Sequence, residues 1–72
     1  MIRDTLLRAL IAKYEGEMSE AEANIEVYLA HPVGIGEHPD IIAALDGQLE
    51  KYAEAEEKWT VVHNQFIGET DE

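Results

Sequence analysis

Apolar residues recur at a mean spacing of 3.5 residues through the first half of this 72-residue chain. A spacing of about 3.5 residues keeps one stripe of an α-helix facing a second helix, as in coiled coils. The pattern predicts a helix over about residues 3–30 with this stripe as its packing surface. The stripe consists of Leu7, Ile11, Tyr14, Met18, Ala21, Ile25 and Tyr28.

A similar pattern in the second half predicts another helix over about residues 40–67. Its spacing has one irregularity, because Leu49, Tyr52 and Ala55 are separated by two consecutive intervals of three residues. Such a stammer overwinds a coiled coil, so we expect a distortion near Tyr52 to Ala55. Tyr52, Trp59 and Phe66 lie seven residues apart and are expected to form one aromatic ridge. The full stripe is Ile42, Leu45, Leu49, Tyr52, Ala55, Trp59, Val62 and Phe66.

The segment between the two patterns, residues 31–40, carries residues that end helices and form turns. Pro32 disfavours helical geometry at the residue before it, and Pro39 suits the first turn of the next helix. Either His38 or Asp40 is suited to cap that helix, and Asp40 places a negative charge at its start. The predicted loop residues are Pro32, Gly34, Gly36, His38, Pro39 and Asp40.

Together these patterns predict an all-α fold, an antiparallel two-helix hairpin resembling a coiled coil, joined by the Pro/Gly loop. We expect a single domain over residues 1–72 that ends in a solvated acidic tail at residues 68–72. Gly16 and Gly47 fall inside the helices, where glycine costs about 1 kcal/mol relative to alanine, so they are expected to permit a kink or a close helix approach.

A lone hairpin leaves apolar residues uncovered. Ile2, Leu6 and Leu10 form a second stripe beside the first, and the chain has no cysteine with which to staple so small a fold. Self-association into a helical bundle, or packing onto a larger protein, would cover both stripes. The expected interface residues are Leu6, Leu7, Leu10, Tyr14, Tyr52, Trp59, Val62 and Phe66.

Charge limits the classes of partner. Sixteen acidic residues against five basic ones give a net charge of −11, which argues against binding nucleic-acid phosphates or an anionic membrane. Residues 14–50 contain no lysine or arginine. A different function therefore stays open, in which the acidic helices mimic nucleic acid and occupy a basic groove of a host nucleic-acid enzyme.

Residues suited to catalysis do not form a recognisable pattern. No pairing of a nucleophile with a base stands out, and the inward-facing Glu-x-x-His spacing of di-iron bundles is absent. His31, Glu37, His38 and Asp40 cluster in the loop and carry the donor atoms of a divalent metal site, but loop capping is the favoured role. We therefore expect no enzyme activity, cofactor or metal.

Two resemblances involve the loop. His38-Pro39-Asp40 resembles the signature of J-domain co-chaperones, although that family presents a basic helix before the tripeptide and this chain presents an acidic one. Residues 32–39, with Tyr28-Leu29 before them and residues 53–58 after them, are similar to short uncharacterised proteins of tailed bacteriophages of aquatic bacteria. The second resemblance implies a phage protein made in the host cytoplasm, with the virion as the other location.

The sequence thus predicts a non-enzymatic structural or adaptor protein of a phage. Its expected partners are further copies of itself or a larger phage or host protein, rather than nucleic acid or a membrane.

Overall fold

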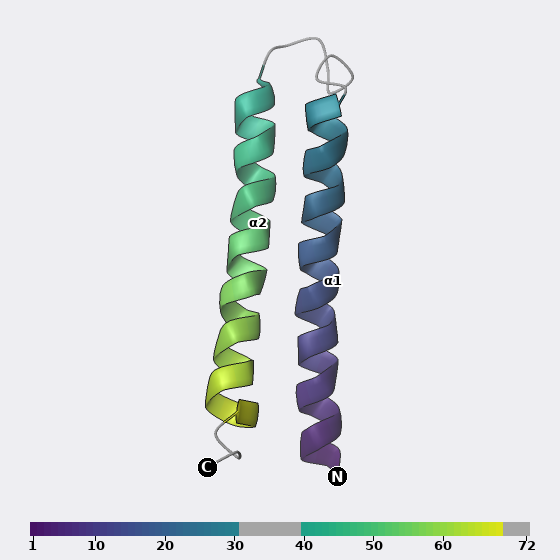
Figure 1. Cartoon of the computed structure of the whole chain (residues 1–72), viewed down its shortest axis with the longest axis vertical. Coiled ribbons are helices and arrows are strands. Elements are labelled where there is room, and N and C mark those ends of the chain that lie inside the picture. The colour runs from purple at the N-terminus through teal and green to yellow at the C-terminus, as the bar shows by residue number, and fades with distance from the viewer. Residues whose placement is uncertain (31–39, 69–72) are drawn as a thin grey trace.

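Two long helices packed against each other make up the fold (Figure 1). The computed structural model describes residues 1–30 and 40–68. Helix α1 spans Ile2–Ala30, helix α2 spans Ile41–Val62, and a π-helical turn, η2, continues α2 over His63–Ile67. The described residues contain no β-strand. The all-helical prediction is confirmed, and the expected helices at 3–30 and 40–67 agree closely with these bounds.

Contacts between the helices define which positions lie side by side. Near the start of α1, the Arg3 guanidinium donates a hydrogen bond to the backbone carbonyl of Phe66 (3.2 Å). Further along α1, the Asn24 side chain donates to the side-chain oxygen of Gln48 (3.2 Å). Figure 1 accordingly shows the start of α1 and the C-terminal end of α2 at the same end of the molecule.

The packing stripe of α1 is the one that the sequence predicts. All seven positions at the 3.5-residue spacing are half-buried or buried, and Ala21 is only 2% exposed. The small side chain of Ala21 is the most buried of the seven. We call this contact between α1 and α2 the seam.

The seam of α2 differs from the prediction at two positions. Ile42 and Leu49 are 73% and 55% exposed, whereas their neighbours Ile41 and Gln48 are half-buried. With these two changes the intervals alternate between four and three without interruption. The predicted stammer near Tyr52 is therefore wrong, and α2 is an unbroken α-helix through that region. The seam residues of α2 are Ile41, Leu45, Gln48, Tyr52, Ala55, Trp59 and Val62.

The irregularity in this helix lies instead at its C-terminal end. In η2 the backbone N–H of Gly68 donates to the carbonyl of His63, five residues earlier, as in a π-helix. A β-carbon at position 68 would lie 3.0 Å from that carbonyl oxygen. Glycine is thus the residue that the close approach at this turn favours.

The glycines inside the helices have no packing role among the described residues. A β-carbon built at Gly16 or Gly47 has no heavy atom within 4 Å, so neither glycine is required for a close helix approach. Replacing Gly16 by alanine should therefore stabilise the fold by about 1 kcal/mol through helix propensity. Urea unfolding followed by circular dichroism measures this, and a loss of stability would contradict it.

Burial is shallow for a chain of this length. Among the described residues, the buried apolar side chains are Ala21, Ala55 and Val62. The accessible surface is 5516 Å², whereas a compact protein of 8.1 kDa has about 4,500 Å². The molecule is elongated, measuring 52 × 18 × 14 Å. One copy consequently exposes much of its apolar surface.

Most of the predicted loop lies outside the described residues, including Pro32, Gly34, Gly36, His38 and Pro39. Asp40 is described and directly precedes α2. Its carbonyl accepts the Ala44 N–H (3.2 Å), but its side chain makes no capping hydrogen bond. The predicted side-chain cap from Asp40 is wrong because its ψ of 38° lies outside the extended conformation that an N-cap usually adopts.

Candidate interaction surface

The predicted interface residues divide into two groups. Leu7, Tyr14, Tyr52 and Trp59 are half-buried in the seam and Val62 is buried there, so the two helices of one chain already use them. Leu6, Leu10 and Phe66 are exposed, at 57%, 36% and 46%. The second group is the part of the predicted interface that remains available for a further chain.

The exposed group gathers at the end of the molecule where the chain begins. Ile2, Leu6 and Leu10 follow one another at intervals of four residues, which places them along one side of α1. Ile2 is 73% exposed. A hollow of about 320 Å³ lies at the same end, lined by Arg3, Asp4, Leu7, Arg8, Phe66 and Ile67. This end therefore combines exposed apolar side chains with both signs of charge.

Trp59 is held by contacts on two sides. Its indole Nε1 donates a hydrogen bond to the Glu15 carboxylate of α1 (3.1 Å), and its ring stacks on the His63 imidazole at 4.8 Å between centroids. The indole thereby joins α1, α2 and η2. Phe66, seven residues later, is more exposed because the π-helical turn shifts it relative to the seam of α2.

A polar pair interrupts the apolar seam. Gln48 occupies a seam position and accepts a hydrogen bond from Asn24, and both residues are half-buried. In coiled coils a buried polar residue costs stability but selects one register and one assembly state. Gln48 cannot be predicted from apolar residues alone, but the regular spacing of the seam residues on either side of it indicates a seam position at 48.

The polar pair leads to a testable prediction. Asn24→Ala leaves the Gln48 amide without its hydrogen bond, so it should lower the free energy of unfolding by about 1 kcal/mol. Replacing both residues by leucine should stabilise the helices while permitting other registers. Thermal unfolding measures the first effect, and light scattering measures the spread of assembly states. A double variant less stable than Asn24→Ala would contradict the assignment.

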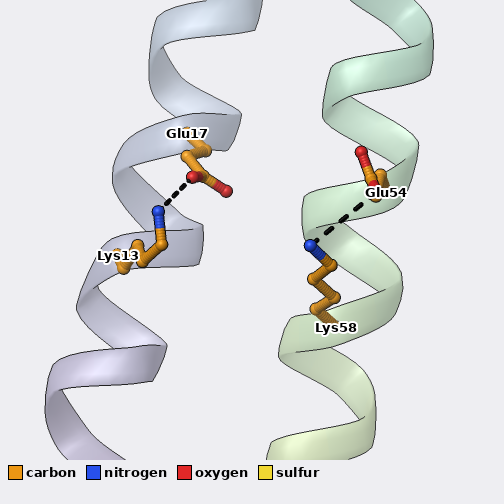
Figure 2. A network of polar contacts seen from close by, with 4 residues as sticks. All are labelled: Lys13, Glu17, Glu54 and Lys58. Atoms are coloured by element: carbon orange, nitrogen blue, oxygen red, sulfur yellow. Dashed lines mark hydrogen bonds and ion pairs between the residues drawn. The ribbon is translucent and has the colours of Figure 1, made fainter.

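Charged side chains line one face that runs across both helices. In α1, Lys13 donates to Glu17 (2.7 Å); in α2, Lys58 lies 3.7 Å from Glu54. Figure 2 shows these two ion pairs on the facing helices, each lysine below its glutamate. The Lys58 ammonium also lies 5.9 Å from the centre of the Tyr14 ring, a cation–π contact between the helices.

These ion pairs contribute little to stability. Each pair joins residues of the same helix, one pair in α1 and one in α2, and the side chains are well exposed to water, which screens the attraction. The hydrogen bond to Glu17, followed by the charge of that carboxylate, raises the pKa of Lys13 above its usual value.

A groove of about 260 Å³ adjoins these ion pairs. The residue at its floor is Ala21, and its walls carry polar and charged side chains from both helices. Among the groove-lining residues, the acids come from both α1 and α2, whereas the lysines come from α2. The lining residues are Glu17, Glu20, Ala21, Asn24, Gln48, Lys51, Glu54 and Lys58.

Donor groups for a metal do not converge within residues 1–30 and 40–68, where no three His, Asp or Glu side chains are grouped to hold an ion. The predicted loop cluster at His31, Glu37 and His38 lies outside these residues. Over the same two segments, neither helix is long and apolar enough to span a membrane. Comparison with protein-family models, curated proteins and solved structures found no match.

Proposed function

We propose that this protein is a non-enzymatic structural or adaptor element whose two helices form an antiparallel hairpin. The hairpin acts by associating with further copies of itself or by packing onto a larger assembly. The hydrogen bonds from Arg3 to Phe66 and from Asn24 to Gln48 support the antiparallel direction, since the start of α1 pairs with η2 and the later part of α1 pairs with the first half of α2.

The observation that carries this proposal is the exposure of the apolar stripe Ile2, Leu6 and Leu10 beside so small a core. Burying a leucine side chain contributes about 1.5–3 kcal/mol. A second chain that covers this stripe therefore supplies stabilisation that one copy lacks. Fibre-like or open-ended growth is avoided when the covered patch is the same on both copies.

The proposed setting is a tailed bacteriophage of aquatic bacteria, in the host cytoplasm or the virion. It is supported by the resemblance over residues 32–39, all of which lie in the segment that the structure does not describe. In that setting the partner is a second copy or a larger phage or host protein.

A second candidate function is that of an acidic antagonist that binds a basic groove of a host nucleic-acid enzyme. It is favoured by the uninterrupted absence of lysine and arginine from residues 14–50, together with the exposure of Glu15, Glu22 and Glu26 along one side of α1. These carboxylates present a row of negative charge to a basic surface.

The salt dependence of association distinguishes the two proposed functions. Apolar association should persist at about 0.5 M salt, where exposed charges are screened beyond a few ångströms. Light scattering of the purified chain at low and at high salt measures this. A stable assembly in both conditions supports the structural role. A monomer in both, with binding to a polycation column that salt abolishes, would favour the acidic antagonist.

A further inference from the structure

The four charged residues of Figure 2 form a pattern across both helices that suits contact with a second copy of the chain. Tyr14 contacts Lys58, so the two lysines of the figure, Lys13 and Lys58, lie at similar heights along the molecule. The two glutamates, Glu17 and Glu54, lie beside each other on the same face, four residues or about 6 Å away along the axis. A row of two positive charges thus lies next to a row of two negative charges.

When two copies of this face are placed against each other, one particular rotation sets positive charges opposite negative charges. A two-fold axis that runs across both helices, between the rows, places the lysine row of each copy over the glutamate row of the other. A two-fold axis along the molecule would place lysine over lysine, which is unfavourable. The charge pattern therefore selects one of the two ways in which two copies can meet on this face.

The same rotation brings the apolar stripe to the groove. On α1 the axis passes at position 15, midway between Lys13 and Glu17. The rotation consequently places Leu10 at the height of Glu20 in the second copy, and Leu6 at the height of Asn24. Both of these residues line the groove. Leu6, Leu10, Lys13, Glu17, Glu20 and Asn24 follow at intervals of four and three, so they share one side of α1.

The charges on α1 and the charges on α2 place this axis at about the same height along the molecule. On α2 it passes at position 56, midway between Glu54 and Lys58. The contacts of Tyr14 with Lys58 and of Asn24 with Gln48 place position 15 of α1 at about the height of position 57 of α2. One axis therefore satisfies the charges on both helices.

We infer that two copies of this chain pair face to face through this surface, α1 against α1 and α2 against α2, each in opposite directions. Leu6 and Leu10 of each copy lie over the groove of the other, and the Lys and Glu rows set the register. This inference rests on the proposed self-association and adds the surface and the orientation through which it occurs.

The test exchanges the charges on the face. In a basic variant, Glu17→Lys with Glu54→Lys, four lysines would face four lysines. Its dimer should dissociate at least about 10-fold more readily than the unmodified dimer, because like charges oppose one another across the interface. An acidic variant, Lys13→Glu with Lys58→Glu, should also dissociate more readily. An equimolar mixture of the two should associate again, with every charge opposed by its opposite.

A matched control separates this effect from net charge. Glu22→Lys with Glu57→Lys makes the same change in net charge as the basic variant, at exposed positions outside the groove. Both variants reduce the net repulsion of a chain with a charge of −11, so the control should associate at least as tightly as the unmodified chain. If the basic variant and its control associate equally well, the inferred face is wrong.

The orientation is tested by disulfide formation, since the chain has no cysteine of its own. A mixture of Lys13→Cys with Glu17→Cys should cross-link between the two variants, and Lys13→Cys alone should cross-link less. The reverse yields would overturn the orientation. An unmodified chain that is monomeric throughout would overturn the proposed function as well, whereas association that is indifferent to all these changes overturns this inference alone.

Discussion

Replacing Trp59 by alanine is expected to lower the free energy of unfolding by about 3 kcal/mol, near the bottom of the range for large aromatic residues because the indole is only half-buried. The variant loses the seam packing, the hydrogen bond to Glu15 and the stacking on His63. For a chain this short, such a loss is a large part of the total stability. Urea unfolding followed by circular dichroism measures it.

Trp59→Phe is the matched control for this variant. Phenylalanine keeps an aromatic ring in the seam but cannot donate to Glu15, and that exposed hydrogen bond is worth about 1 kcal/mol or less. Most of the stability should therefore return. An alanine variant as stable as the unmodified protein would mean that Trp59 does not hold the helices together.

Replacing both Leu6 and Leu10 by glutamate is expected to abolish self-association. Two copies contribute four such leucines, and burial of their exposed parts, at about 1.5–3 kcal/mol for a whole leucine side chain, corresponds to a loss of about 100-fold or more in the dissociation constant. Because the second copy covers surface that one copy exposes, helicity at low protein concentration should fall as well. Sedimentation equilibrium measures the dissociation constant, and circular dichroism measures the helicity.

Ile42→Glu with Leu49→Glu is the matched control, because it adds the same charge and also removes two exposed apolar side chains. Ile42 and Leu49 are 73% and 55% exposed, and Leu49 lies nine residues before Lys58, which turns it about 180° away from the charged face of α2. This variant should associate like the unmodified chain. Equal weakening by the control would show that the apolar stripe of α1 has no special part in assembly.

The first helix could be predicted from its spacing because every position of its seam carries an apolar residue, the small Ala21 included. Every predicted position from Leu7 to Tyr28 lies in the seam. The seam positions of the second helix are harder to predict from the sequence. The choice depends on which face meets α1, and it lies between Ile41 and Ile42 at one position and between Gln48 and Leu49 at another. Leucine is the usual seam residue, but the amide of Gln48 gains a hydrogen bond from Asn24 there.

Other features depend on contacts between residues far apart in the sequence. The hydrogen bond from Trp59 to Glu15 and the cation–π contact of Lys58 with Tyr14 arise only after the helices pack. The π-helical turn at His63 has no signal in the spacing of apolar residues, so the exposure of Phe66 could not be predicted.

For the candidate site, composition and spacing located the apolar stripe at Leu6 and Leu10, and the structure leaves both exposed. The charge rows could not be read from the sequence. Each Lys–Glu pair looks like an ordinary pair within one helix, and their common height becomes evident only when α1 and α2 are placed side by side (Figure 2).

We expect that one copy of this chain buries too little apolar surface to be stable without association. Measuring the thermal unfolding midpoint across a 100-fold range of protein concentration tests this expectation. We predict that the midpoint rises with concentration, because association stabilises the folded state by mass action. A midpoint that stays constant across the range, for a chain that sediments as a monomer, would contradict the claim.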